Sequence, residues 1–268
     1  MLNLKKNVTV PGLRDFKRAG VPIAMLTAYD ASLARRIDGA GVDCVLVGDS
    51  LGNVIQGQSS TLPVTVDDIV YHTRAVSSGL ERALLIADLP FMTYYDRPTA
   101  MANAARVMRA GAGMVKIEGG AAVAEIVTGL VDQGIPVCAH LGLTPQHVHR
   151  LGGYRVQGRE QAMAEALIED GRALESAGAA LLVVECIPAS LARRVTEALD
   201  IPVIGIGAGV EVDGQVLVSY DMLGISSGRL PKFVRDFMAG AGSVAAALEA
   251  YVSAVRERQF PEPAEGYE

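Results

Sequence analysis

The 268-residue sequence contains only three cysteines, and they follow neither a disulfide nor a metal-binding pattern. Cys44, Cys138 and Cys186 form an odd set without C-x-x-C spacing, and each lies in or beside an apolar run. A disulfide framework is therefore not expected, and the pattern favours reduced thiols packed in a core.

Long hydrophobic runs are also missing. Charge, glycine or proline interrupts every apolar stretch before it reaches the roughly 18 residues that a membrane-spanning helix needs. The N-terminus, MLNLKKNVTVPGLRDFKRAG, has basic residues but no apolar segment behind them and no small-residue cleavage site. We therefore expect a cytoplasmic protein.

Clusters of lysine and arginine are absent as well. The 24 basic and 30 acidic residues give a formal net charge of −6, so nucleic acid is not an expected partner. An acidic protein that handles an anion needs a local positive charge, which a lysine, a loop of backbone amides or a metal ion could supply.

The sequence does contain a regular alternation of short apolar runs with longer segments of helical periodicity. The runs lie at 22–30, 43–49, 83–88, 113–118, 135–140, 180–185, 201–207 and 215–221. Several of the helical segments end in glycine, which is typical of helix C-termini. Because the runs are almost wholly apolar, they indicate parallel strands covered on both faces.

Eight such strands predict an α/β protein with a closed (β/α)8 TIM barrel, formed by residues 1–268 as a single domain. The segment 207–221 leaves little room for a seventh helix, and residues near 7–19 could form a lid across the barrel bottom. The alternative is a doubly wound open sheet, but its usual glycine-rich fingerprint after the first strand is missing.

Polar residues close several of the apolar runs. They are Asp49, Asp88, Glu118, His140 and Glu185. In a barrel the carboxyl ends of all strands face one mouth, so these side chains are expected to meet there. Lys116 lies two residues before Glu118 and therefore on the same face of its strand.

A single strand-end acid could merely cap a helix or pair with an arginine, but several together repel each other and need compensation. Asp49, Asp88 and Glu118 sum to −3, which Lys116 and one divalent ion would balance. A carboxylate substrate could then bind beside Glu185. Oxygen ligands without a nearby cysteine favour Mg²⁺ over Mn²⁺ or Ca²⁺. Lys116 could instead form a Schiff base, although neighbouring acids favour a charged ammonium.

Two further motifs are weaker. GIGAG at 205–209 fits a phosphate-cradling or tight-packing loop better than a dinucleotide site. His147 and His149 lie two residues apart in a glycine-rich loop that is long enough for a lid, but they lack a third partner for zinc.

At these positions the sequence resembles the ketopantoate hydroxymethyltransferase family. The matching stretches cover most of residues 25–235 in order: TAYDAS, LVGDSLGNVIQGQSSTLPVTVDDIVYHTRAV, ADLPFM, RAGAGMVKIEGG, CAHLGLTPQ, GGYRVQGR, VVECIP, IPVIGIGAG and PKFVRDF. VGDSLG together with LPVTVDDIVYHT is specific enough to make coincidence implausible.

The resemblance implies a barrel of the phosphoenolpyruvate/pyruvate type that is Mg²⁺-dependent. It also implies transfer of a hydroxymethyl group from 5,10-methylenetetrahydrofolate to 3-methyl-2-oxobutanoate, giving 2-dehydropantoate. By motif, Asp49 and Asp88 would hold the metal, with Glu118 as third ligand or as support through water. The keto acid would be bound by Asp49, Ser50, Asp88 and Lys116, and Glu185 would be the catalytic base. Such enzymes bind small molecules and assemble as homo-oligomers, often decamers.

Two other functions deserve comparison with this one. A carbon–carbon lyase or phosphonomutase of the related barrels would share the metal chemistry without needing folate. Those relatives typically use a catalytic cysteine after a mid-barrel strand, whereas HLGLTPQ here has none after Cys138. A non-catalytic metabolite-binding barrel would bind the keto acid tightly without turnover.

Overall fold

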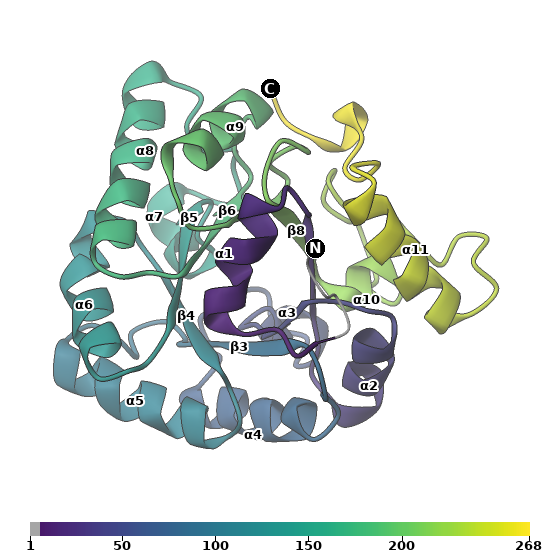
Figure 1. Cartoon of the computed structure of the whole chain (residues 1–268), viewed down its shortest axis with the longest axis horizontal. Helices are drawn as coiled ribbons and strands as arrows, with labels where there is room; N and C mark the ends of the chain where they lie inside the picture. The colour runs from purple at the N-terminus through teal and green to yellow at the C-terminus, as the bar shows by residue number, and fades with distance from the viewer. Residues whose placement is uncertain (1–5) are drawn as a thin grey trace.

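Eight parallel strands close into a barrel in the computed structural model, which describes residues 6–268. The strands are β1 (Ile23–Thr27), β2 (Cys44–Val47), β3 (Leu84–Asp88), β4 (Met114–Glu118), β5 (Val137–Gly142), β6 (Leu181–Glu185), β7 (Val203–Ile206) and β8 (Gly214–Leu217). Each strand pairs with the next, and β8 returns to pair with β1 (Figure 1). The predicted barrel is confirmed, and the open doubly wound sheet is wrong.

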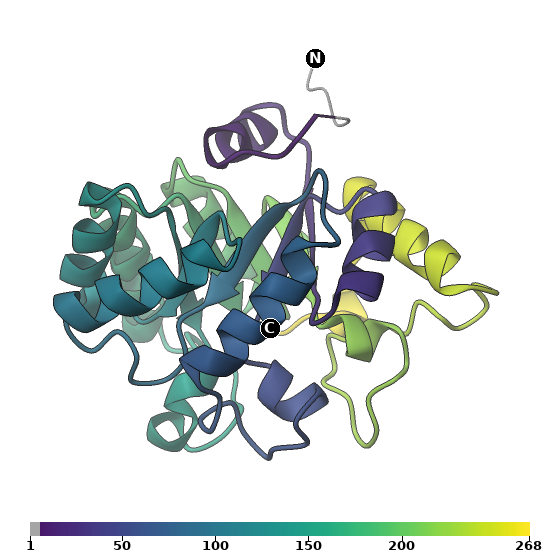
Figure 2. The same ribbon diagram turned by 90° about the horizontal axis from the view of Figure 1, so that it is seen from below.

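Helices surround this barrel on its outside and at its ends (Figure 2). They are α1 (Val10–Arg18), α2 (Ala31–Gly39), α3 (Leu51–Val54), α4 (Val66–Ser77), α5 (Arg97–Arg109), α6 (Ala124–Asp132), α7 (Val148–Leu151), α8 (Gln161–Ser176), α9 (Ala189–Ala198), α10 (Ser219–Met222) and α11 (Val244–Arg256), with 3₁₀ turns η1 (Ala121–Val123), η2 (Pro145–His147) and η3 (Pro263–Glu265). The strands are buried along nearly their whole length because side chains fill the barrel inside and helices cover it outside, which explains their continuous apolar runs.

Local signals set where the helices begin and end. Helix α4 starts with a capping box in which Thr65 and Asp68 satisfy each other's backbone amides. Helix α5 starts at Asp96, whose carboxylate accepts a hydrogen bond from the Thr99 amide. Just beyond the end of α5, Gly111 adopts a φ of 115°, a backbone conformation that favours glycine over residues with a Cβ.

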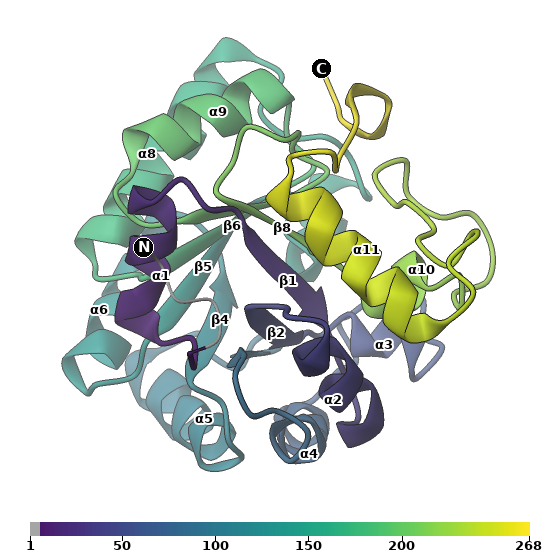
Figure 3. The same ribbon diagram turned by 45° about the vertical axis from the view of Figure 1, so that its right-hand side comes forward.

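The seventh βα unit is incomplete. Residues 207–213, all of them described, form bends and irregular chain without a helix between β7 and β8, as the short spacing suggested. The long C-terminal helix α11 covers the barrel beside this gap, where it contacts β1 and α2 (Figure 3). The barrel therefore remains closed although one of its helices is missing.

Helix α1 lies across the amino-terminal end of the barrel, as expected for residues 7–19 (Figure 2). Lys17 donates hydrogen bonds to the carbonyl oxygens of Thr196, in α9, and Ile201, just before β7. It also pairs with Asp213, just before β8. Cys44, Cys138 and Cys186 are buried and free, as predicted. Among residues 6–268, no helix has the length and apolar character needed to cross a membrane.

Candidate active site

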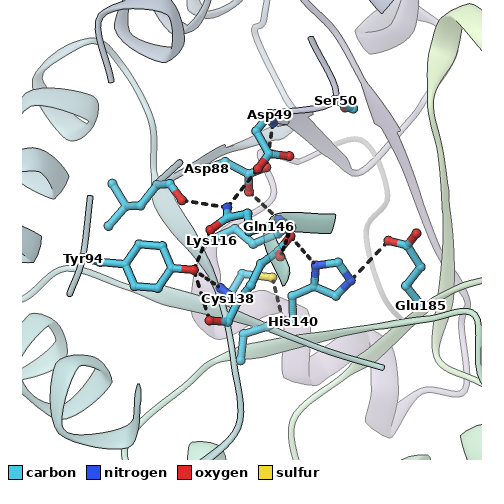
Figure 4. Close-up of polar contacts among 12 residues, drawn as sticks. Asp49, Ser50, Asp88, Tyr94, Lys116, Cys138, His140, Gln146 and Glu185 are labelled. Atoms are coloured by element: carbon cyan, nitrogen blue, oxygen red, sulfur yellow. Dashed lines mark hydrogen bonds and ion pairs between the residues drawn. The ribbon is translucent and has the colours of Figure 1, made fainter. Parts of the chain in front are cut away.

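The register of the barrel places polar strand-end residues side by side. Asp88 of β3 lies beside Lys116 of β4, and Glu118 of β4 lies beside His140 of β5. Glu185 ends β6 at the same edge. Since the strands are parallel, all these side chains reach the carboxyl end of the barrel and converge there (Figure 4).

The converging side chains line a cavity of about 980 Å³. Every residue that the sequence singled out for the site contributes to its wall: Asp49, Ser50, Asp88, Lys116, Glu118, His140 and Glu185. All the charged groups among them except Glu185 are at most 4% exposed, whereas the Glu185 side chain is 15% exposed. Glu185 is thus the most accessible of these carboxylates to a ligand in the cavity.

Lys116 is held between two carboxylates. Its Nζ lies 2.6 Å from Asp88 Oδ1 and 3.7 Å from Glu118 Oε1. Burial alone would lower the pKa of Lys116, but the negative charges of Asp88 and Glu118 raise it above its ordinary value. The amine therefore stays protonated, which favours an ammonium that attracts an anion over a Schiff-base nucleophile.

Gln146, which the sequence analysis did not single out, is inserted among the acids. Its Nε2 donates hydrogen bonds to Asp49 Oδ2 at 2.9 Å and to the Leu89 carbonyl at 3.0 Å, and its backbone amide donates to Glu118 Oε2 at 3.0 Å. Its side-chain oxygen accepts from the Tyr94 hydroxyl at 2.7 Å. The only sequence signal was the TPQ motif after β5. The glutamine orients two of the carboxylates without adding charge.

His140 lies between the inner acids and Glu185. Its Nδ1 is 3.1 Å from Glu118 Oε1, and its Nε2 is 3.3 Å from Glu185 Oε2, at an angle that does not make a hydrogen bond. Burial opposes protonation of His140, but the hydrogen bond and charge of Glu118 outweigh it and raise the pKa to about 9. A protonated imidazole here links Glu185 to the rest of the site.

Negative charge is in excess in this cluster. With all of them ionised, the four carboxylates contribute −4, whereas Lys116 and protonated His140 contribute +2, which leaves −2. Burial, followed by the charges of Asp88 and Glu118, raises the pKa of Asp49 well above its usual range. One divalent cation would balance this excess.

The donor set near Asp49 and Asp88 fits a hard cation with few protein ligands. Asp88 Oδ1 makes no hydrogen bond within the described residues and has only its ion pair with Lys116. No three carboxylate, imidazole or thiol groups in residues 6–268 are arranged to enclose a metal ion by themselves. Both oxygens of Glu118 are already engaged, by His140 and Gln146. Asp49 and Asp88 would therefore bind an ion that takes its other ligands from substrate and water, which is common for Mg²⁺.

Two hydroxyl groups complete the cavity wall. Ser50 Oγ lies 2.8 Å from the Tyr29 hydroxyl, which holds the serine beside Asp49. Thr61, from the loop before α4, is 2% exposed, and its hydroxyl has no hydrogen-bond partner in the described chain. Nothing in the sequence distinguishes Thr61, because an isolated threonine in a loop carries no distinctive pattern. Its buried hydroxyl is available to a ligand.

The weaker motifs lie outside the acid cluster. His147 bonds Thr144 through Nδ1, at 3.0 Å, and neither His147 nor His149 lines the cavity. In the GIGAG segment, a Cβ on Gly209 would come within 2.5 Å of Ala189 Cβ, so this glycine permits tight packing of α9 on the turn after β7.

Comparison with known proteins relates the chain to one enzyme family. The model of the ketopantoate hydroxymethyltransferase family matches residues 7–263. The 3-methyl-2-oxobutanoate hydroxymethyltransferase of Chromohalobacter salexigens is 56% identical over 256 residues, which are 96% of this chain and 97% of that protein. The enzyme of the same name from Shewanella halifaxensis is also 56% identical, over 95% of this chain and 96% of its own.

Among solved structures, 2,3-dimethylmalate lyase, described as a member of the PEP mutase/isocitrate lyase superfamily, superimposes with a TM-score of 0.55. The match covers 96% of this chain and 89% of the lyase at 19% identity. This likeness supports the barrel fold and carries no information about the reaction.

Proposed function

The chain belongs to the ketopantoate hydroxymethyltransferase family and adds a hydroxymethyl group to 3-methyl-2-oxobutanoate, and we propose that it does so with Mg²⁺ and with 5,10-methylenetetrahydrofolate as donor. The product is ketopantoate, a precursor of pantothenate. This family membership favours the hydroxymethyltransferase over the two alternative functions, a lyase and a non-catalytic metabolite-binding barrel. The whole chain would act as one barrel domain.

Asp49 and Asp88 would hold the Mg²⁺ ion, and Glu118 would support it through water. The direct engagement of both Glu118 oxygens by His140 and Gln146 favours the supporting role. When bound, the ion would withdraw electron density from the keto group and make the C3 proton more acidic.

The keto acid would bind with its carboxylate end toward Lys116. The Lys116 ammonium is the buried cation nearest to Asp88 and offsets negative charge that appears on the substrate oxygens. Ser50, beside Asp49 and anchored by Tyr29, would donate a hydrogen bond to the same end. Asp49 and Asp88 would reach the keto acid through the ion.

Glu185 would accept the proton from C3. Its carboxylate lies at the cavity wall beyond the inner acids, and one of its oxygens faces His140 Nε2 at 3.3 Å. The other oxygen is then free to face the substrate and to receive the proton. The substrate carbon so activated would attack the methylene carbon of the folate. The two bonds between that carbon and the folate nitrogens would break, tetrahydrofolate would leave, and water would supply the hydroxyl group of the product.

One observation carries this proposal: Glu185 is separated from the Lys116 cluster by His140, so the base and the anion-binding groups lie in one cavity without being paired with each other. A base that was paired with the buried lysine could not readily take a proton from a substrate bound to that lysine.

The proton transfer can be tested without folate. 3-Methyl-2-oxobutanoate is incubated with enzyme and Mg²⁺ in D₂O, and NMR follows the C3 proton, with chelator and Glu185→Gln as controls. We expect exchange that is lost on chelation and falls by at least about a hundredfold in Glu185→Gln. Unchanged exchange in Glu185→Gln would assign the proton to another base. No exchange in wild type, even after tetrahydrofolate is added, would contradict the proposed mechanism.

Ion binding can be measured separately with Mn²⁺ as a spectroscopic probe. Electron paramagnetic resonance should detect Mn²⁺ bound to wild type in the presence of the keto acid, and Asp88→Asn should weaken that binding together with keto-acid binding. Equal Mn²⁺ affinity in the two proteins would remove Asp88 from the proposed ion site.

Family membership is also the basis on which we propose a cytoplasmic homo-oligomer, with a decamer as the expected form. Light scattering on the purified protein measures the assembly mass directly. A monomer across the micromolar range would contradict this assignment.

A further inference from the structure

The cavity has a second, chemically different half that the proton-transfer residues do not use. Its wall is built by Tyr154, Arg155, Arg229, Lys232, Phe233 and Tyr267. We infer that this half binds the carboxylate-bearing glutamate tail of the folate donor, with Arg155 and Arg229 as the groups that recognise the tail. This inference rests on the folate donor proposed above.

The charge of the outer half is opposite to that of the inner half. Arg155, Arg229 and Lys232 contribute three positive charges to a cavity whose floor is acidic. Among the described residues that line the cavity, Asp221 is the one acid besides the four carboxylates of the floor, and its Oδ1 already accepts a hydrogen bond from Ser226 Oγ at 2.6 Å. The rim is therefore positive in a protein whose formal net charge is −6, and it would attract an anionic group.

Two of the three cations have no internal partner. Within residues 6–268, the guanidinium groups of Arg155 and Arg229 make neither a hydrogen bond nor an ion pair, unlike Arg235, which forms bonds of 2.7 Å to both oxygens of Glu265. Both side chains belong to exposed residues at the cavity wall. Free guanidinium groups can bind carboxylates through paired hydrogen bonds.

One wall of this half is tied firmly to the barrel. Lys232 Nζ donates a hydrogen bond of 2.7 Å to the Gly266 carbonyl and lies 5.6 Å from the centre of the Tyr267 ring. The Tyr267 carbonyl accepts from the Ala189 amide at 2.9 Å. Phe233 packs so closely on Gly207 that a Cβ there would approach its ring to 2.7 Å. The Arg229 loop and the C-terminal segment therefore form one supported wall.

The loop between α7 and α8 forms another part of the wall. Gly152 and Gly158, with φ of 69° and 74°, bracket Tyr154 and Arg155. Tyr154 lines the same cavity as Asp49, Glu118 and Glu185, although the residue is 55% exposed. Tyr154 and Arg155, adjacent in the chain, therefore bring an aromatic ring and a cation to the cavity wall.

The folate donor matches this arrangement in shape and charge. Its reactive methylene group belongs to the pterin end, which must reach the substrate carbon near Glu185. The p-aminobenzoyl ring and the glutamate tail then extend outward, where Tyr154, Phe233 and Tyr267 offer aromatic or apolar contact. The tail carries two carboxylates, and they would lie among the basic side chains of the rim.

Two ligands that differ only in the glutamate tail distinguish recognition of the tail from binding of the rest of the folate. Calorimetry compares tetrahydrofolate with tetrahydropteroate, which lacks the glutamate, on the full-length protein with Mg²⁺ and keto acid present. Wild type should bind tetrahydrofolate about tenfold more tightly, which is the size expected for two partly exposed ion pairs. In R155Q/R229Q this advantage should fall to within about twofold. The matched control is R159Q, which changes an exposed arginine of the same loop that does not line the cavity and should keep the full advantage.

The outcomes decide the inference separately from the proposed mechanism. Tail recognition by these arginines would be overturned if R155Q/R229Q still bound tetrahydrofolate about tenfold more tightly than tetrahydropteroate. It would also be overturned if wild type bound the two ligands equally well. The proton-exchange assay on wild type contains no folate and tests only the inner half. Normal exchange with no tail advantage would therefore remove this inference alone, whereas failed exchange would count against the proposed mechanism.

Discussion

Buried carboxylates are balanced by neighbouring cations at one end of the barrel and only partly balanced at the other. At the amino-terminal end, the fully buried Asp43 carboxylate is matched by Arg82 at 3.3 Å and Arg256 at 2.6 Å, and Asp213 is matched by Lys17 at 2.9 Å. On the acidic floor of the cavity at the carboxyl end, four carboxylates share one lysine and one histidine. The chain neutralises the acids of the first end by itself, whereas those of the second end need a ligand.

This difference separates stability from function within one fold. Charged groups that are satisfied internally hold the ends of strands and helices together, and they have no capacity left for a ligand. Charged groups that are incompletely satisfied cost folding energy and supply binding energy when an ion or a substrate arrives. The same residue type, aspartate, has both roles in this barrel.

Two matched substitutions, one at each end of the barrel, test this difference between the ends most directly. The larger effect is expected from Asp49→Asn, on the binding of the keto acid. Asp49→Asn removes one of the crowded acids and should weaken keto-acid binding in the presence of Mg²⁺ by about a hundredfold, as loss of one partner from a buried charge pair commonly does. The thermal midpoint of the ligand-free protein should stay the same or rise, because the charges of Asp88 and Glu118 then meet less repulsion. A clear fall of that midpoint would mean that Asp49 has a structural role.

The other member of the pair is Asp43→Asn. It removes the carboxylate with which Arg82 and Arg256 pair, and we expect the free energy of unfolding to fall by about 3 kcal/mol in urea titrations. The rate of proton exchange per folded molecule should not change. Asp15→Asn, at a pair of 3.8 Å that is mostly exposed, serves as the control and should change stability by less than about 0.5 kcal/mol.

His140→Gln tests whether the imidazole at the acidic carboxyl end contributes to proton transfer or to keto-acid binding. His140 faces Glu185 at 3.3 Å, and if it acts by positioning that carboxylate, its loss should slow C3 proton exchange by about ten- to a hundredfold and change keto-acid affinity much less. Steady-state exchange over a range of keto-acid concentrations separates the two quantities. An equal loss of affinity and rate would indicate that the imidazole contributes to binding.

The smallest effect is expected at Lys17. Its ammonium pairs with Asp213 and bonds two carbonyl oxygens, and the side chain is 18% exposed. Lys17→Met should lower the free energy of unfolding by about 1 kcal/mol and leave exchange unchanged. A measurable loss of catalytic rate would show that the two ends of the barrel are coupled.

Some of this architecture is readable in the sequence because it depends on local patterning. A strand buried on both faces must be apolar along its length, and a helix must repeat its apolar residues every three to four positions. The eight strands, the lid formed by α1 and the position of the strand-end acids follow from that rule. The resemblance of the motifs added the roles of Asp49, Ser50, Asp88, Lys116, Glu118 and Glu185, which remain predictions.

The partners of those residues depended on the tertiary structure. Asp88 meets Lys116, and Glu118 meets His140, only because the strand register aligns residues that are more than twenty positions apart. The insertion of Gln146 between Asp49 and Glu118, and the excess of arginine at the rim, come from loops whose paths no periodicity encodes. Periodicity reflects how each residue divides between water and core, whereas such contacts arise only when distant segments close together.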